Sequence, residues 1–218
     1  MNETTTTLAD LAVAHPAAAR VFYDNRLDFC CGGNHLFVDA CRVRGLDADA
    51  ILDEIRRQET VGEPPTRWEL APTSALVDHI VTHYHRRLRA ALPHLVEMAR
   101  LVEARHHDKV ACPIGLAALL EHVHRSVLHH LAKVGAFLFP PIGRGTAARV
   151  SAPVSGMELD HQHHKSDLLR IRALTSDLTP PADACTTWRA LYTGLQRLEQ
   201  ELMEHIHLEN NILFRRAL

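Results

Sequence analysis

The last twenty residues of the chain, 199–218, carry the feature that most limits its fold. His205 and Glu209 stand four positions apart, so on an α-helix both side chains share one face, one turn apart. An imidazole and a carboxylate on one helix face can supply half of a non-haem metal site. We therefore predict a pair that faces a helical core, where a metal ion would satisfy both polar groups. The apolar residues around the pair are Leu198, Leu202, Ile206, Leu213 and Phe214.

Histidine is the outlier in the composition. The 218 residues include 17 histidines, which are dispersed along segments with helical periodicity rather than gathered in a tag-like tract. Histidine is the commonest protein ligand for metals. Hydrophobic residues make up 46% of the chain, enough for a core in one or two domains, and abundant Ala, Leu, Glu and Arg favour helix over strand.

Charge and cysteine content argue against several classes of protein. The formal net charge of −2 gives no electrostatic footprint for nucleic acid. The five cysteines are odd in number and loosely spaced, unlike the framework of a disulfide-rich secreted domain. The N-terminal residues show no signal peptide, and no apolar run approaches the length of a membrane span. We expect a cytoplasmic protein with no nucleic-acid and no membrane partner.

Residues 1–59 are predicted to form a small helical domain. A threonine from the run 4–7 caps the first helix, and the His15-Pro16 pair ends it, because a residue before proline avoids the helical region. Further helices are expected at 17–25, 36–44 and 47–59, the last with Asp47 as its cap.

The loop after the second of these helices carries adjacent cysteines, Cys30 and Cys31, followed by two glycines. Vicinal cysteines can close a strained ring that is reduced more easily than an ordinary disulfide. Together with Cys41 they could also serve thiolate chemistry, capturing iron or nitrosyl groups. The alternative is that two of the three are small buried hydrophobes. We interpret Cys30 and Cys31 as redox thiols.

The proline-rich segment 60–72 reads as a linker, and residues 73–218 as a four-helix bundle. The first helix starts near Thr73, and Pro93 is a candidate for a kink in it. The second runs from Pro113 to the Pro140-Pro141 pair, and a mobile loop is expected over 142–156. The third is expected at 157–176, and the fourth runs from about residue 183 to the C-terminus.

Several motifs together resemble one known family. They are His15-Pro16, the LDFCCGG run at 27–33, the Pro180-Pro181 pair with ACTTW at 184–188, and HIHLENN at 205–211. The chain resembles the RIC (repair of iron centres) family, the ScdA/YtfE-like proteins. The resemblance implies a small N-terminal ScdA domain followed by a hemerythrin-like di-iron bundle. It further implies repair of iron–sulfur clusters after nitrosative or oxidative damage, an interaction with nitric oxide, and a homodimer formed through the N-terminal domain.

The resemblance also implies a set of iron ligands. The family's motifs match His85 after Tyr84, His130 ahead of Leu-Phe-Pro, and His161 after Asp160, together with the C-terminal His-Glu pair. The implied cofactor is non-haem iron, as two ions. The implied ligands are His85, His130, His161, His205 and Glu209.

One position departs from the family pattern. Val134 stands where the family carries a bridging Glu, so a single bridging carboxylate, Glu209, remains. His164, three positions beyond His161, is a further ligand candidate that could compensate in part. Glu121 and His106 lie too far along their helices to join the same cluster. The remaining histidines of the predicted bundle are expected at the surface or behind the ligands: His79, His83, His94, His107, His122, His124, His129, His163 and His207.

The function predicted from this set is iron–sulfur cluster repair, by iron donation or nitric oxide binding, on damaged iron–sulfur proteins as partners. The alternative is a hemerythrin-like protein that binds or senses nitric oxide or oxygen and has no repair activity. A bundle that lost its metal and kept an interaction role is a third reading, for which Val134 is the sequence feature. We see no nucleophile array or phosphate-binding glycine loop, so no catalytic residue is assigned and a metal-binding stress protein is favoured over a hydrolytic or oxidative enzyme.

Overall fold

The computed structural model describes residues 5–60, 66–143 and 151–218, and within these ranges the chain is helical and contains no strand. The predicted all-α class is therefore confirmed. The chain divides into two compact units, Met1–Asp78 with Met203–Leu218, and His79–Leu202. The division crosses the last long helix, so that helix contributes to both units.

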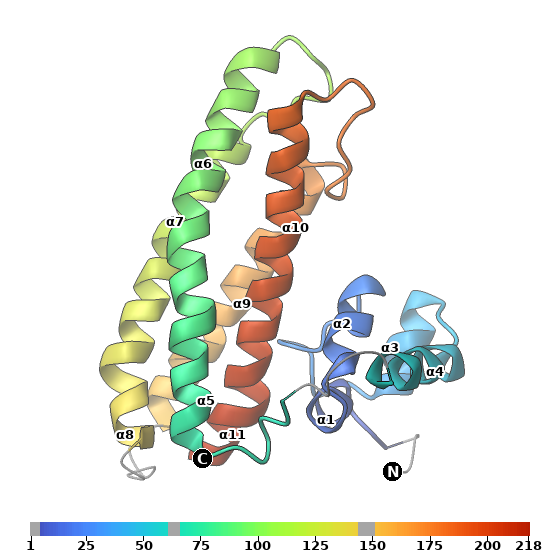
Figure 1. Ribbon diagram of the computed structural model, residues 1–218, viewed down its shortest axis with the longest axis vertical. Helices are drawn as coiled ribbons and strands as arrows, with labels where there is room; N and C mark the ends of the chain where they lie inside the picture. The colour runs from blue at the N-terminus through green and yellow to red at the C-terminus, as the bar shows by residue number, and fades with distance from the viewer. Residues whose placement is uncertain (1–4, 61–65, 144–150) are drawn as a thin grey trace. The chain divides into compact units, whose positions relative to one another are not determined.

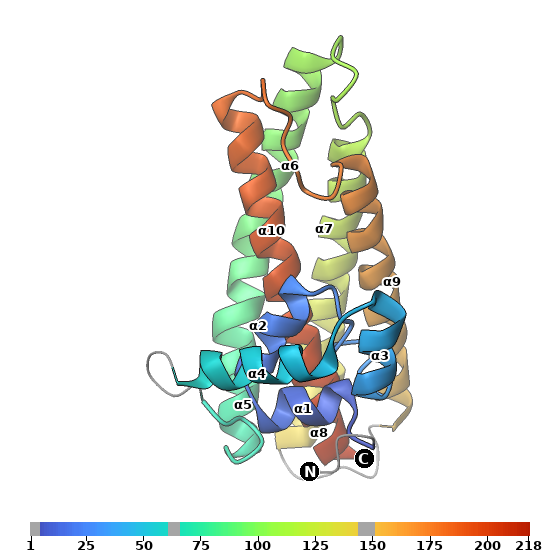
Figure 2. The ribbon, with the colours of Figure 1, turned by 90° about the vertical axis from the view of Figure 1, so that its right-hand side faces the viewer.

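The unit His79–Leu202 is a bundle whose long helices lie side by side (Figures 1 and 2). Their apolar faces carry the buried residues, such as Leu88 and Leu92 on one helix and Leu120 and Val127 on the next. Within the described residues of this unit, two π-helical segments interrupt the α-helices. The elements are η1 (Ile80–His85), α6 (Arg86–His106), α7 (Leu116–Lys133), η2 (Val134–Leu138), α8 (Phe139–Gly143), α9 (Ser151–Leu174) and the first part of α10 (Thr186–His207).

Polar contacts fix how the helices of this unit pair. Glu103 on α6 accepts a hydrogen bond from the backbone N–H of Ala117 at 2.7 Å and so caps the first turn of α7. On α9, Arg172 forms a fork-like pair with Glu199 on α10, and both side chains are largely buried. Because truncation of one partner would leave a buried charge, this pair specifies how α9 and α10 pair.

The helix ends differ from the sequence prediction at three places. α9 begins at Ser151, inside the segment expected to be a loop, because Val154 and Met157 are buried and their packing outweighs the low helix propensity of nearby Gly and Pro. α7 begins at Leu116, after Gly115 with φ of +92°. The Pro140-Pro141 pair does not end the helix, because it occupies the first turn of α8, where a missing N–H costs little.

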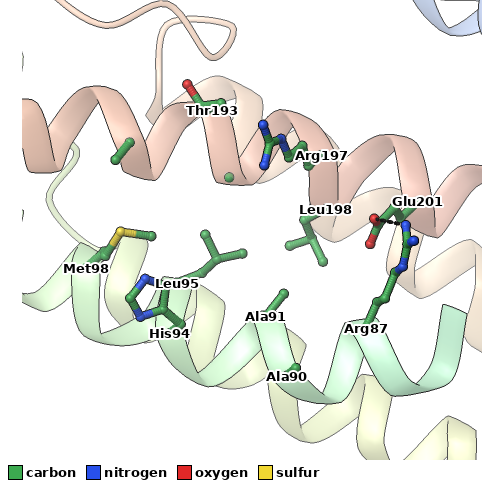
Figure 3. A pocket seen from close by; sticks show the side chains of 12 residues that line it. Arg87, Ala90, Ala91, His94, Leu95, Met98, Thr193, Arg197, Leu198 and Glu201 are labelled. Carbon is green, nitrogen blue, oxygen red and sulfur yellow. Dashed lines mark hydrogen bonds and ion pairs between the residues drawn. The ribbon is translucent and has the colours of Figure 1, made fainter. Parts of the chain in front are cut away.

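A shallow groove of about 710 Å³ runs between α6 and α10 (Figure 3). Its lining combines alanines and Gly194 with larger side chains such as Leu95, and an ion pair between Arg87 and Glu201 at 3.2 Å lies on its rim. Gly194 lets the helices approach closely here, since a Cβ at this position would lie 2.6 Å from Cδ2 of Leu95.

The other unit joins the N-terminal helices to the C-terminal end of the chain. Thr7 and Asp10 form a reciprocal capping box at the start of the first helix, and Asp47 caps the fourth, as predicted. Phe22 packs against Phe29 and Phe37, with ring centroids 6.1 and 5.9 Å apart. The elements are α1 (Leu8–Ala14), α2 (Ala17–Asp24), α3 (Phe37–Arg44), α4 (Ala48–Glu59), α5 (Thr73–His79), the end of α10, η4 (Leu208–Leu213) and α11 (Phe214–Ala217). The last residue of α5, His79, already belongs to the bundle unit.

Candidate metal centre

Three π-helical segments lie at or next to the predicted ligand positions. η1 ends at His85, η2 begins at Val134 one turn after His130, and η4 contains Glu209. A π-helical turn carries one residue more than an α-turn, and such turns are frequent at functional sites. The helices were predicted from apolar residues that recur with the period of a regular α-helix. That pattern does not reveal an extra residue in a turn, so the π-helical segments were not predicted.

In the bundle unit, His130 and His161 point their ring nitrogens at each other. The two Nε2 atoms lie 3.3 Å apart, and both side chains are buried. Two nitrogens at about 2.1 Å from one ion lie roughly 3.0 to 3.4 Å apart when the angle between them is square or tetrahedral. The observed separation therefore fits two ligands of one metal ion without rearrangement.

Asp160 orients His130 from the opposite side of the imidazole. Its Oδ2 lies 3.4 Å from Nδ1 of His130 and 2.5 Å from Nζ of Lys133. The hydrogen bond with His130 and the ammonium of Lys133 hold the pKa of this carboxyl well below its usual range. An ionised Asp160 keeps the proton on Nδ1 of His130, which leaves the Nε2 lone pair for a metal. In the sequence Asp160 stands out only as the residue before His161, because its contact with His130 crosses from α9 to α7.

Replacing Asp160 by asparagine is expected to weaken iron binding about 10- to 100-fold, because the group that fixes the tautomer of His130 is lost. The measurement is competition against a chromophoric chelator. Glu158→Gln removes a charge from an exposed position on the same helix and serves as the control. Equal affinities of the two variants would show that Asp160 does not support the ligand.

At the C-terminal end, His205 and Glu209 lie as their spacing predicted. Nε2 of His205 is 3.1 Å from Oε1 of Glu209, and the side chains are 1% and 0% exposed. Glu209 belongs to two groups of buried residues that could hold a metal ion: His85, His205 and Glu209 in one, and His130, His161 and Glu209 in the other. Each group offers two imidazoles and one carboxylate, the donor set typical of non-haem iron. The residues present therefore fit iron.

The other residues weighed as ligands are not members of these groups. Val134 is fully buried. His164 is buried with its ring edge-on to that of His130, 5.4 Å between centroids, and it belongs to neither group. His106 lies 3.3 Å from Sγ of Cys185, and Glu121 pairs with Arg100.

The cysteine loop is held by the C-terminal segment within its own unit. Asn210 and Asn211 donate hydrogen bonds to the carbonyls of Cys30 and Phe29 at 3.0 and 2.9 Å. His207, expected at the surface or behind the ligands, is buried against Phe29, and burial lowers its pKa to about 4. The run HIHLENN thus carries candidate ligands together with residues that position the cysteine loop. Sequence reasoning used this run for the His205–Glu209 pair and as a family motif, and it gave the two asparagines no role.

The two cysteines are free thiols, with their sulfur atoms 3.8 Å apart. Cys30 is buried and Cys31 is partly exposed. The hydrogen bond to Cys31, burial and the nearby carboxylate of Asp28 all raise the pKa of the Cys30 thiol. Cys30 is therefore protonated at neutral pH unless a cation or an oxidant changes its state.

Comparison with known proteins decides the family. Residues 4–59 match the ScdA N-terminal domain, described as a domain of unknown function, and residues 76–217 match the hemerythrin HHE cation-binding domain. The chain is 43% identical over 211 residues to the iron–sulfur cluster repair protein YtfE of Dickeya chrysanthemi, covering 97% of this chain and 96% of the relative. It belongs to the YtfE family. Identity to YtfE of Musicola paradisiaca is 46% over 213 residues, covering 97% and 95%, and to YtfE of Yersinia pseudotuberculosis 43% over 211 residues, covering 97% and 96%.

Membership in the YtfE family confirms the predicted cofactor class. The matched hemerythrin domain contains every candidate ligand from His85 to Glu209, and the cofactor is non-haem iron. In the part of the chain that the structure describes, no helix is both long and apolar enough to span a lipid bilayer.

Proposed function

We propose that this protein repairs damaged iron–sulfur clusters by supplying iron from its bundle or by binding nitric oxide there. The observation that carries the proposal is the buried set of four imidazoles around one shared carboxylate. Related YtfE proteins bear the name of iron–sulfur cluster repair proteins, which supports the same role for this chain. The partners are damaged iron–sulfur proteins.

The ligand set suits a protein that releases its iron. When bound, iron supplies a site for small ligands such as nitric oxide or oxygen species and a source of metal for rebuilding clusters. Four neutral imidazoles and one carboxylate offset less of the charge of two ferrous ions than a set with two bridging carboxylates. Because Val134 stands in the place of the second carboxylate, the site should bind iron more weakly and release it more easily. We propose that the iron ligands are His85, His130, His161, His205 and Glu209. His164 is the candidate for an additional ligand.

The N-terminal domain, which we place at residues 1–59, has a supporting role in the proposal. Cys30 and Cys31 act as redox thiols that reduce the iron site or accept iron or nitrosyl groups from it. The loop is anchored by Asn210 and Asn211, on the segment that also carries His205 and Glu209, which supports a link between the two chemistries. We place the protein in the cytoplasm, as a homodimer through this domain.

The test is reactivation of a [4Fe–4S] dehydratase inactivated with nitric oxide, using anaerobically iron-loaded protein. Full-length wild type is expected to restore activity, and a Cys30→Ser/Cys31→Ser variant to restore it several-fold more slowly while holding the same iron. Unchanged repair by this variant would remove the thiols from the mechanism. Stoichiometric nitric oxide binding without any reactivation would instead support the binding or sensing alternative.

A further inference from the structure

A second cluster of metal-binding side chains lies away from the histidines, in the loop between α2 and α3. It consists of Asp28, Cys30 and Cys31, whose ligand atoms all lie within 4.8 Å of one another. Cys30 is buried, and the other two are partly exposed. The repair proposal has the two cysteines reduce the iron site or accept iron or nitrosyl groups from it, and it gives Asp28 no role.

The distances within this cluster match a tetrahedral metal site. With metal–sulfur bonds of about 2.3 Å and a metal–oxygen bond of about 2.1 Å, tetrahedral angles place two sulfurs roughly 3.8 Å apart and a sulfur and an oxygen roughly 3.6 Å apart. The structure has 3.8 Å between the two Sγ atoms and 3.5 Å between Sγ of Cys30 and Oδ1 of Asp28. A disulfide would need its sulfurs at about 2.05 Å, so the loop would have to move to form one.

We propose that Asp28, Cys30 and Cys31 bind a thiophilic divalent cation of the zinc type, with two thiolates and one carboxylate as protein ligands and the fourth position open. Binding releases the two thiol protons to solvent and changes no oxidation state. The two sulfurs and the carboxylate lie within 4.8 Å of one another, so their deprotonated forms would repel one another without a cation. A divalent cation offsets that repulsion and favours the thiolates.

The loop is built to hold this arrangement. The backbone N–H of Cys31 donates to Oδ1 of Asp28 at 3.1 Å, which turns the carboxylate back towards the thiols. Gly32 leaves room for that turn, because a Cβ there would lie 2.8 Å from Oδ2 and 3.0 Å from the backbone oxygen of Asp28. Asn210 fixes the backbone of Cys30 from the C-terminal segment. Supports of this kind orient ligands before the metal arrives.

A bound cation would also control the redox chemistry of the pair. Both sulfurs are occupied as ligands, so neither is free to attack the other or to be alkylated. Metal binding and disulfide formation are then mutually exclusive states of Cys30 and Cys31. The open fourth position leaves room for an incoming donor, such as a thiol of a partner protein or solvent.

The test titrates cobalt(II) as a spectroscopic probe into the full-length chain after anaerobic iron loading. The histidine and carboxylate donors of the bundle cannot give a thiolate-to-cobalt charge-transfer band, so this band reports cobalt bound to cysteine, and the variants below assign it to the loop. One cobalt per chain is expected to produce the band together with tetrahedral d–d absorption, and zinc is expected to bleach both by displacement. Absence of the band in the wild type would overturn the proposal.

Variants assign the ligands. Cys30→Ser/Cys31→Ser is expected to abolish the band and Cys31→Ser to roughly halve it, while Cys41→Ser, at a buried cysteine outside the cluster, leaves it intact. Asp28→Asn and Gly32→Ala are expected to weaken cobalt binding about 10-fold or more with the band retained. A band that survives in the double serine variant, or wild-type affinity in both Asp28→Asn and Gly32→Ala, would contradict the site. Unchanged iron content and far-ultraviolet circular dichroism show that each variant is folded.

Discussion

Glu209→Gln is expected to reduce bound iron from two ions per chain to less than one, the largest loss of iron from any single substitution among the proposed ligands. Glu209 is the carboxylate common to both groups of buried donors, so its replacement leaves only neutral imidazoles. Hard ferrous ions bind poorly without an anionic oxygen ligand. Loss of one imidazole, as in His85→Ala, removes a donor from one group only and should leave more iron bound. The measurement is iron per chain after anaerobic reconstitution and desalting.

Two controls separate this loss from misfolding. Glu201→Gln removes a carboxylate from α10, the helix that precedes η4, at a rim position where the ion pair with Arg87 contributes little, and iron should stay at the wild-type level. The iron-free Glu209→Gln protein should unfold in urea at the same or a higher midpoint than iron-free wild type, because a buried carboxylate costs stability when no metal neutralises it. A variant that keeps two irons would exclude Glu209 as the shared ligand.

Gly33→Ala is expected to destabilise the unit that contains the N-terminal helices by about 3 kcal/mol. An added Cβ would lie 2.8 Å from Cβ of Ala9, 2.9 Å from the backbone oxygen of Phe29 and 3.1 Å from Oδ1 of Asn211. None of these atoms is the far end of a long flexible side chain, so the backbone of the cysteine loop must move. That movement also disrupts the hydrogen bond from Asn211 to Phe29.

The measurement is urea unfolding of iron-free protein, followed by circular dichroism. Gly156→Ala is the matched control, because Gly156 lies within α9 and a Cβ there meets nothing within 4 Å. This control should stabilise the protein by about 0.5 to 1 kcal/mol through helix propensity. Similar midpoints for the two variants would show that Gly33 is not packed as the structure has it.

The parts of the fold that sequence could predict are those set by local chemistry. Asp47 caps α4, and the capping box of Thr7 and Asp10 opens α1, because such signals act within a few residues. The spacing of His205 and Glu209 also placed them together, since helix geometry fixes neighbours four positions apart.

The parts that escaped sequence reasoning depend on contacts between distant segments. The first turn of α9 forms because Val154 and Met157 find a buried environment, which propensity does not register. The pairing of Asp160 with His130 crosses from α9 to α7. The hydrogen bond from Asn211 to the carbonyl of Phe29 in the cysteine loop joins positions that are 182 residues apart in the sequence. The π-helical turns at the ligand positions likewise could not be predicted from local sequence, because no local pattern indicates an extra residue in a turn.

The most direct test of the central claim is iron per chain in the wild type and in Val134→Glu after anaerobic ferrous reconstitution. The account holds that Glu209 serves both groups, so the wild type should already bind two irons per chain. Val134→Glu should not raise that number, although it should slow the transfer of iron to a chelator. One iron or none in the wild type, restored to two by Val134→Glu, would contradict the account of a two-iron centre built on a single shared carboxylate.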